Sequence, residues 1–229
     1  MEIFIDIETI PAQNPGVREA IAKDITAPGN YTKPETIAKW EAESKPALVD
    51  EAWRKTSFDG ALGHLAVISV ACDDFPPTTF HASAPTVEAV VAEEHAVLAA
   101  FFRHLSEVYS PSTDRPPRFV GHYITEFDLR FIFQRAVIFG ERPPAFIPFH
   151  AKPWDEAVFD TMTKWAGARG TVKLDKLCQV FGFPGKGEID GSKVWDYVNG
   201  GRLLEVAEYC AGDVARARSI YKRLTFQAA

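Results

Sequence analysis

The sequence is poor in cysteine and in long hydrophobic runs. Only three of its 229 residues are cysteines, Cys72, Cys178 and Cys210, and no two of them form a CxxC pair. Their odd number and wide spacing argue against a disulfide framework or a zinc knuckle, so we expect reduced thiols in a cytoplasmic protein. No apolar run reaches the roughly 18 residues that a membrane span needs. The acidic start MEIFIDIETIP is not typical of a signal peptide.

Positive charge is also in short supply. Lys and Arg total 25 against 31 Asp and Glu, which gives a formal net charge of −6. Proteins that hold long duplexes by electrostatics alone tend to be basic, so that class is disfavoured. An acidic site that divalent cations neutralise remains compatible with a nucleic-acid substrate. We then expect a short footprint at a strand end and an affinity that rises with metal.

Hydrophobic residues, at 46%, are plentiful enough for a sizeable core. Their spacing predicts strands at 3–8, 64–72, 78–82 and 118–123, and long helices at 86–108, 127–140 and 201–225. Shorter helical pieces are expected near 157–166 and 173–181, before a glycine-rich loop at 182–193. Prolines and helical spacing between residues 14 and 58 predict a helical insertion after the first strand. We therefore expect one α/β domain over 1–229, with a mixed central sheet and flanking helices.

Asp6 and Glu8 lie two residues apart on the first predicted strand. Side chains at i and i+2 share one face of a strand, and Ile5 and Ile7 occupy the other face. A strand this apolar is usually central, where two buried carboxylates are costly unless something neutralises them. A metal ion would do so; a solvated strand face is the alternative.

Two more acids stand at positions with a structural purpose. Asp213 occupies a core-facing gap in the apolar stripe of the last helix, and Tyr209 lies one turn before it on the same face. Asp128 follows a strand and begins a helix, where the dipole favours an acid and Thr125 is a plausible N-cap. Each acid alone has an ordinary structural explanation. Their combination with the DxE pair is the informative feature.

In this order the three motifs resemble the DEDD superfamily of 3′→5′ exonucleases, whose fold is RNase H-like. The matching segments are FIDIETIP at 4–11, VGHYITEFDLRFI at 120–132 and AEYCAGDVARA at 207–217. Tyr209, with Glu208 rather than histidine before it, indicates the tyrosine subtype (DEDDy). Within that group the chain most resembles the proofreading exonucleases of family-B DNA polymerases, in a stand-alone form.

The resemblance implies two-metal hydrolysis. One cation would be held by Asp6, Glu8 and Asp213 and the other by Asp6, with Asp128 reaching it through water. Oxygen ligands point to Mg²⁺ or Mn²⁺. Tyr209 would orient the attacking water or deprotonate it, and orientation is the safer role because a free phenol has a pKa near ~10.

Three residues are candidates for substrate binding. The family's second motif usually reads GHN, but Tyr123 stands in the asparagine position, where it would stack on a base or else pack inward. Thr9, after the DxE pair, would touch the terminal nucleotide or merely end the strand. Lys186, in the loop PGKG, would reach a phosphate or remain solvated.

The leading interpretation is a metal-dependent 3′→5′ exonuclease acting on single-stranded DNA ends, in repair or in proofreading in trans. A 3′→5′ exoribonuclease of the same fold is the nearest alternative, since nothing in the sequence clearly reads a 2′-hydroxyl. A non-catalytic nucleic-acid-binding scaffold is the alternative from another class. It gains nothing from clustered carboxylates, and metal-dependent hydrolysis would distinguish it. No membrane partner is expected.

Overall fold

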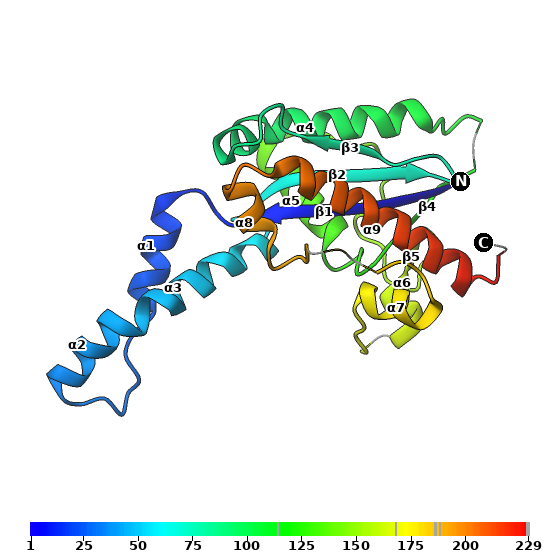
Figure 1. Ribbon diagram of the computed structural model, residues 1–229. Coiled ribbons are helices and arrows are strands. Elements are labelled where there is room, and N and C mark those ends of the chain that lie inside the picture. The colour runs from blue at the N-terminus through cyan, green and yellow to red at the C-terminus, as the bar shows by residue number, and fades with distance from the viewer. Residues whose placement is uncertain (114, 168, 186, 188, 228–229) are drawn as a thin grey trace.

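The computed structural model describes residues 1–113, 115–167, 169–185, 187 and 189–227. Figure 1 shows helices on both sides of a central sheet, with an arm of helices extending away from it. Along the chain the elements are β1 (Glu2–Ile10), α1 (Pro15–Asp24), α2 (Pro34–Glu43), α3 (Lys45–Arg54), the 3₁₀ turn η1 (Lys55–Phe58), β2 (His64–Cys72), β3 (Thr78–His81), α4 (Val87–Val108), β4 (Arg118–Gly121), α5 (Asp128–Phe139), β5 (Val158–Asp160), α6 (Thr161–Ala166), α7 (Leu174–Phe181), α8 (Val194–Asn199) and α9 (Leu203–Leu224).

The sheet has five strands in the order β3-β2-β1-β4-β5. β1 is central: it pairs antiparallel with β2 and parallel with β4, while β5 extends the parallel half. The predicted α/β fold with a mixed sheet and flanking helices is therefore confirmed. Every predicted strand and long helix is present, with ends shifted by a few residues.

The two faces of β1 meet different helices. Ile3, Ile5 and Ile7 pack in a core with side chains of α4 and α5. Phe4, on the opposite face, packs with Val214 and Tyr221 of α9. Strand alternation therefore turns the even-numbered residues of β1, Asp6 and Glu8 among them, toward α9.

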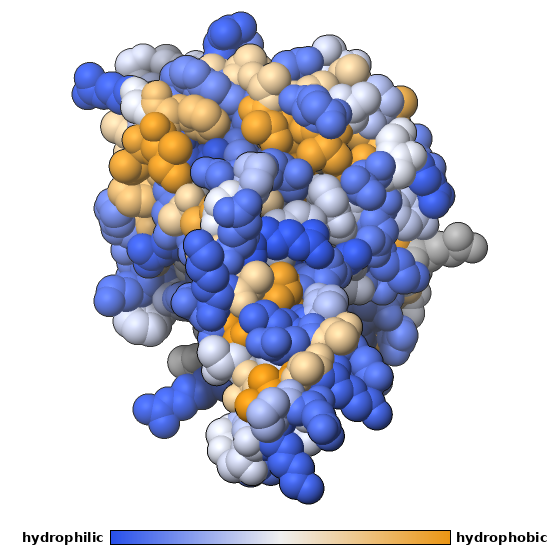
Figure 2. All heavy atoms as spheres, turned by 90° about the vertical axis from the view of Figure 1, so that its left-hand side faces the viewer, coloured by the Kyte–Doolittle hydropathy of each residue, from blue (hydrophilic) through white to orange (hydrophobic). Residues whose placement is uncertain are grey.

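The predicted helical insertion is the arm in Figure 1, made of α1, α2, α3 and η1. At its base the indole Nε1 of Trp53 donates to the carbonyl of Ala12 at 2.8 Å, and its ring meets Trp195 edge-on at 5.0 Å. Arg54 bonds Asp196 of α8 at 2.8 Å. Figure 2, seen from the side of the arm, shows a mainly hydrophilic surface with separate hydrophobic groups.

Three local expectations were incomplete or wrong. β5 was missed because it has only three residues and belongs to the sheet only through its pairing with β4. α8 was missed because it is a six-residue helix within a glycine-rich segment. Thr125 does not cap α5: Phe127 holds the N-cap position without a side-chain bond, and the Thr125 hydroxyl instead faces Asp160 at 3.5 Å.

A buried ion pair joins α4, α5 and β2. Glu94, 1% exposed, accepts from Nε and Nη2 of Arg135, both at 2.6 Å, and from the amide of Leu65 at 2.8 Å. Burial alone would raise the pKa of Glu94, but its bonds to His64 and Arg135 hold that pKa below the usual value. Glu94 is thus a carboxylate whose charge depends on Arg135.

In the described part of the chain, no helix is long and apolar enough to cross a membrane.

This ion pair gives a stability prediction. Arg135→Met keeps most of the packing of the side chain but leaves Glu94 buried without its main countercharge, which typically costs about 3–5 kcal/mol. The midpoint of urea unfolding should fall accordingly. Arg130→Met, at an exposed position of the same helix, is the matched control and should change stability by less than about 0.5 kcal/mol. Equal midpoints for the two variants would contradict this account.

Candidate active site

Three acidic side chains meet between β1 and α9. Asp6 and Glu8 face α9 from the strand, and Asp213 faces the strand from the helix. One carboxylate oxygen from each lies within 4.8 Å of the other two. Asp6 is partly buried, and Glu8 and Asp213 are buried. The three acids that the sequence motifs singled out therefore lie together in the structure.

The apolar stripe of α9 fixes this meeting. Val206, Cys210, Ala217 and Ile220 are all buried, and Asp213 continues the same stripe. The thiol of Cys210 donates to the backbone carbonyl of Asp6 at 3.3 Å. Because Asp213 follows Cys210 by three residues, this bond sets the height of Asp213 along β1.

Asp128 reaches the same strand at the edge beyond Phe4, where the pairing with β4 has ended. It is the first residue of α5, is 3% exposed, and its Oδ1 accepts from the amide of Ile7 at 3.0 Å. Ile7 lies between Asp6 and Glu8. Burial, followed by the charge of Asp6, raises the pKa of Asp128 well above its usual value. The fourth predicted carboxylate therefore lies close enough to Asp6 to feel its charge.

The donor set fits a hard divalent cation. It consists of carboxylate oxygens, the ligands that Mg²⁺ and Mn²⁺ prefer. The ligands of one octahedral ion lie about 3 Å apart when adjacent and about 4.2 Å apart when opposite, so oxygens within 4.8 Å of one another can close on one ion by side-chain rotation. Clustered negative charges repel one another when buried, and a cation relieves that repulsion.

Tyr209 joins the cluster from one turn earlier on α9. The side chain is 8% exposed. Burial raises the pKa of its phenol strongly, and so do the charges of Glu8, Asp213 and Asp6 and a hydrogen bond to Asp213. Tyr209 therefore keeps its proton, and its hydroxyl is a donor rather than a base.

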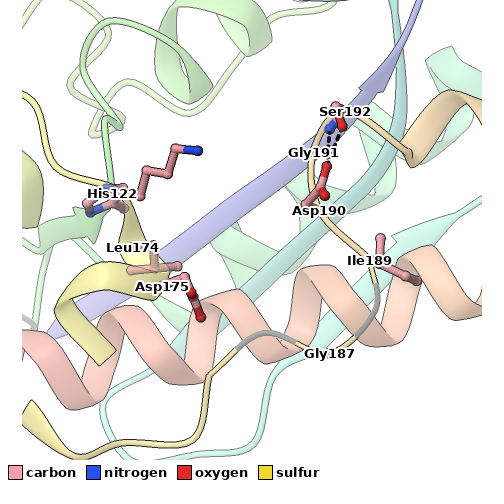
Figure 3. A pocket seen from close by; sticks show the side chains of 9 residues that line it. His122, Leu174, Asp175, Gly187, Ile189, Asp190, Gly191 and Ser192 are labelled. Carbon is pink, nitrogen blue, oxygen red and sulfur yellow. Dashed lines mark hydrogen bonds between the residues drawn. The ribbon is translucent and has the colours of Figure 1, made fainter. Parts of the chain in front are cut away.

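Three neighbouring cavities lie beside Tyr209 and Thr9. The largest, about 620 Å³, lies between the start of α7 and the loop at 187–192. Figure 3 shows His122, Leu174 and Asp175 on one side of it, with Ile189 and Asp190 on the other, and β1 passing behind.

Two smaller cavities adjoin the largest one. A cavity of about 310 Å³ contains Tyr209 and shares Gly187 and Ile189 with it. A cavity of about 170 Å³ contains Thr9 and shares Gly191 and Ser192 with it. These three neighbouring cavities, which share wall residues, are together called the groove.

The predicted substrate residues have different surroundings. Tyr123 is 45% exposed, with φ at 67°, which excludes the alternative that it packs inward. Thr9 is buried at 8% exposure, and its hydroxyl donates to the carbonyl of Ser57 at 2.7 Å, so this hydroxyl is bonded within the chain. Lys186 lies outside the described residues.

Two cations near the site were missed from the sequence. Lys173 lines the largest of these cavities; its only signal in the sequence was its place as the first residue of the helix predicted at 173–181. Arg216 donates from Nη1 to Oδ1 of Asp213 at 2.6 Å and from Nη2 to the carbonyl of Gly185 at 3.2 Å. Its position three residues after Asp213 could have indicated that contact.

Asp160 is a buried acid that holds the backbone next to the site. It is fully buried, caps α6 by accepting from the amides of Met162 and Thr163, and accepts from the amide of Tyr123 at 3.2 Å. It therefore holds the backbone that presents Tyr123.

Comparisons with known proteins identify the family and the fold of the chain. Residues 62–229 match a family described as predicted 3′-5′ exonucleases related to the exonuclease domain of PolB. That segment contains Asp128, Tyr209 and Asp213 but not Asp6 or Glu8. No curated protein matches the chain.

Among solved structures, the family B DNA polymerase from the hyperthermophilic archaeon Pyrobaculum calidifontis is similar in fold, with a TM-score of 0.57 at 17% identity. The alignment covers 97% of this chain and 24% of the polymerase, so the chain spans about a quarter of that protein's length. By its family match, which extends over most of its length, the chain belongs to the predicted 3′-5′ exonucleases related to the exonuclease domain of PolB.

Proposed function

We propose that this protein is a metal-dependent 3′→5′ exonuclease that hydrolyses phosphodiester bonds at the 3′ ends of single-stranded DNA. The observation that carries the proposal is the approach of the Asp6, Glu8 and Asp213 oxygens to within 4.8 Å of one another. Asp128, bonded to the amide of Ile7 between two of them, completes the set. Family membership supports the reaction class.

The four carboxylates would hold two ions, Mg²⁺ or Mn²⁺: Asp6, Glu8 and Asp213 one, and Asp6 with Asp128 the other. When bound, such ions lower the pKa of a coordinated water and stabilise the charge that develops on phosphate oxygens. The chain supplies the other functions. The Tyr209 hydroxyl would orient the attacking water, since it keeps its proton. Lys173, in the largest cavity, would contact a substrate phosphate.

The groove supports a single-stranded substrate. Residues 187 and 189–192 contribute to the walls of all three cavities, which also include Thr9, next to Glu8, and Tyr209, one turn before Asp213. The net charge of −6 fits a short contact at a strand end better than a long electrostatic footprint on duplex. A cytoplasmic role in DNA repair is part of the proposal, and three cysteines that form no disulfide agree with a reducing compartment.

The direct test is incubation of 5′-labelled single-stranded DNA and RNA of matched sequence with Mg²⁺, Mn²⁺ or EDTA. We expect a ladder that shortens from the 3′ end, only with metal, and faster for DNA. Faster shortening of RNA would favour the exoribonuclease. Binding without hydrolysis in every condition would favour the scaffold.

The first prediction concerns the ligands. Asp6→Asn should lower turnover at least about 100-fold, because it removes a ligand whose metal-bound form supplies several kcal/mol of transition-state stabilisation. Its metal-free melting temperature should equal or exceed that of the parent, since the carboxylates then repel one another less. Asp24→Asn, at an exposed acid on α1, is the matched control. Parent-like turnover of Asp6→Asn would remove Asp6 from the site.

The second prediction concerns Tyr209. Tyr209→Phe removes only the hydroxyl, so it should reduce kcat by about 100-fold, as expected for a lost oriented donor. The affinity for Mn²⁺, measured by calorimetry, should remain unchanged. A large loss of that affinity would instead make Tyr209 a support for the ligand Asp213.

The third prediction concerns Tyr123, whose ring is 45% exposed. If the ring stacks on a base, Tyr123→Ala should raise KM for short oligonucleotides about 5- to 100-fold, the range that base–aromatic stacking implies. Tyr123→Phe retains the ring and should be nearly silent. An unchanged KM for Tyr123→Ala would reject stacking.

A further inference from the structure

Phe58 is a large apolar side chain left in the open at the base of the arm. It ends η1 and is 68% exposed. One edge of its ring meets Phe127, with 6.1 Å between centroids and 63° between planes. This contact fixes the ring but leaves much of its surface to solvent. Phe58 also lies outside the segment that matches the exonuclease family.

The position of Phe58 is set by neighbours of two proposed ligands. The carbonyl of Ser57 accepts from the hydroxyl of Thr9 at 2.7 Å, and Thr9 directly follows Glu8. The ring contact is to Phe127, which directly precedes Asp128. Phe58 therefore stands at the rim of the carboxylate site, between the end of β1 and the start of α5.

The turn that carries Phe58 is rigidly held. Thr56 is buried; its hydroxyl accepts from the amide of Ala12 at 2.8 Å and donates to the carbonyl of Trp53 at 2.6 Å. At Gly63 a Cβ would lie 2.7 Å from the carbonyl of Thr56 and 2.9 Å from that of Ile10, so only glycine allows this close packing. The ring of Phe58 is thus presented by a pre-organised backbone, which lowers the entropy cost of binding.

A cavity of about 170 Å³ opens beside the ring. Phe58, Pro11 and Trp195 contribute apolar walls, and the cavity joins the largest one through Gly191 and Ser192. Two cations also line it, but Arg54 is paired with Asp50 and Asp196, and Lys55 with Glu51. Any ligand here would be held by its flat apolar surface more than by charge.

We propose that Phe58 stacks on a nucleobase of the single-stranded substrate within four nucleotides of its 3′ end, and that the cavity beside it receives this base. A nucleobase fits the aromatic and apolar surface, since every base offers a π-face. Thr9, which directly follows Glu8, lines the same cavity as Phe58, so a base in this cavity lies near the carboxylate site. The inference rests on the proposed function and gives the arm a part in it: positioning the strand.

The test is a thermodynamic cycle between the side chain and the base. Binding of a 5′-labelled single-stranded 12-mer is measured by anisotropy, with Ca²⁺ in place of Mg²⁺ and phosphorothioate linkages at the 3′ end to slow cleavage. Phe58→Ala should raise Kd about 5- to 100-fold, and Phe58→Trp should restore it. The ratio of the Kd of Phe58→Ala to that of the parent should be similar at about 50 and 200 mM salt, because a stacking contact releases no counterions.

The cycle is completed with oligonucleotides that lack one base at each of the last four positions. At the position that stacks, base removal should weaken binding by the parent but not by Phe58→Ala, because both changes delete one contact. Phe75→Ala is the matched control, because Phe75 is also an exposed phenylalanine (71%). It lies just after Cys72, which pairs with Ile3 at the end of β1 opposite to Thr9. It should bind like the parent.

The outcomes separate this inference from the proposed function. A parent that degrades the 3′ end, together with a Phe58→Ala variant that binds every oligonucleotide equally well, overturns the role of Phe58 alone. The role of Phe58 is also overturned if Phe58→Ala raises Kd by the same ratio for the intact oligonucleotide and for all four abasic ones. A parent that neither binds nor degrades single strands overturns the proposed function and this contact with it.

Discussion

Repulsion among carboxylates on a buried strand is the constraint around which the site is organised. β1 is the middle strand of the sheet, so the face that carries Asp6 and Glu8 is covered by a helix rather than by bulk water. Their partners across β2 are the small residues Ser69 and Val67, which leave room for the acids. Asp213 adds a third negative charge in the same space. Such a cluster is tolerable only where cations can approach it.

Among the described residues, Arg216 supplies part of that countercharge. Arg216 contacts one oxygen of Asp213, and its other end binds the carbonyl of Gly185 at the start of the loop that borders the groove. One guanidinium therefore links the acidic cluster to the wall of the substrate path. The neutralised ion pair of Glu94 and Arg135 elsewhere in the core shows the contrast. There each charge has its partner in place, and the pair serves the fold rather than a reaction.

The sequence predicted the elements whose information is local, and with them the acids. Alternation along 3–8 and the helical stripe ending at Leu224 are properties of single segments, so β1, α9 and the facing of Asp6, Glu8 and Asp213 could be anticipated. β5 could not, because three residues become a strand only by pairing with β4. The exposure of Tyr123 and the contact between the rings of Phe58 and Phe127 could not be predicted either. Both depend on how the arm and the turn before α5 pack together. No spacing in the chain encodes such contacts.

The family match begins at residue 62, after the strand that carries Asp6 and Glu8. The sheet shows why that strand still belongs with the rest. β1 lies between β2 and β4, which do not pair with each other, so without it the matched segment would hold two separate strand pairs with two additional open edges. Two hydrogen bonds attach the arm to the end of β1. The indole of Trp53 donates to the carbonyl of Ala12, and the hydroxyl of Thr9 donates to the carbonyl of Ser57. We therefore propose that residues 1–229 form one domain, in which the first strand completes both the sheet and the acidic cluster. The arm then extends the rim of the groove.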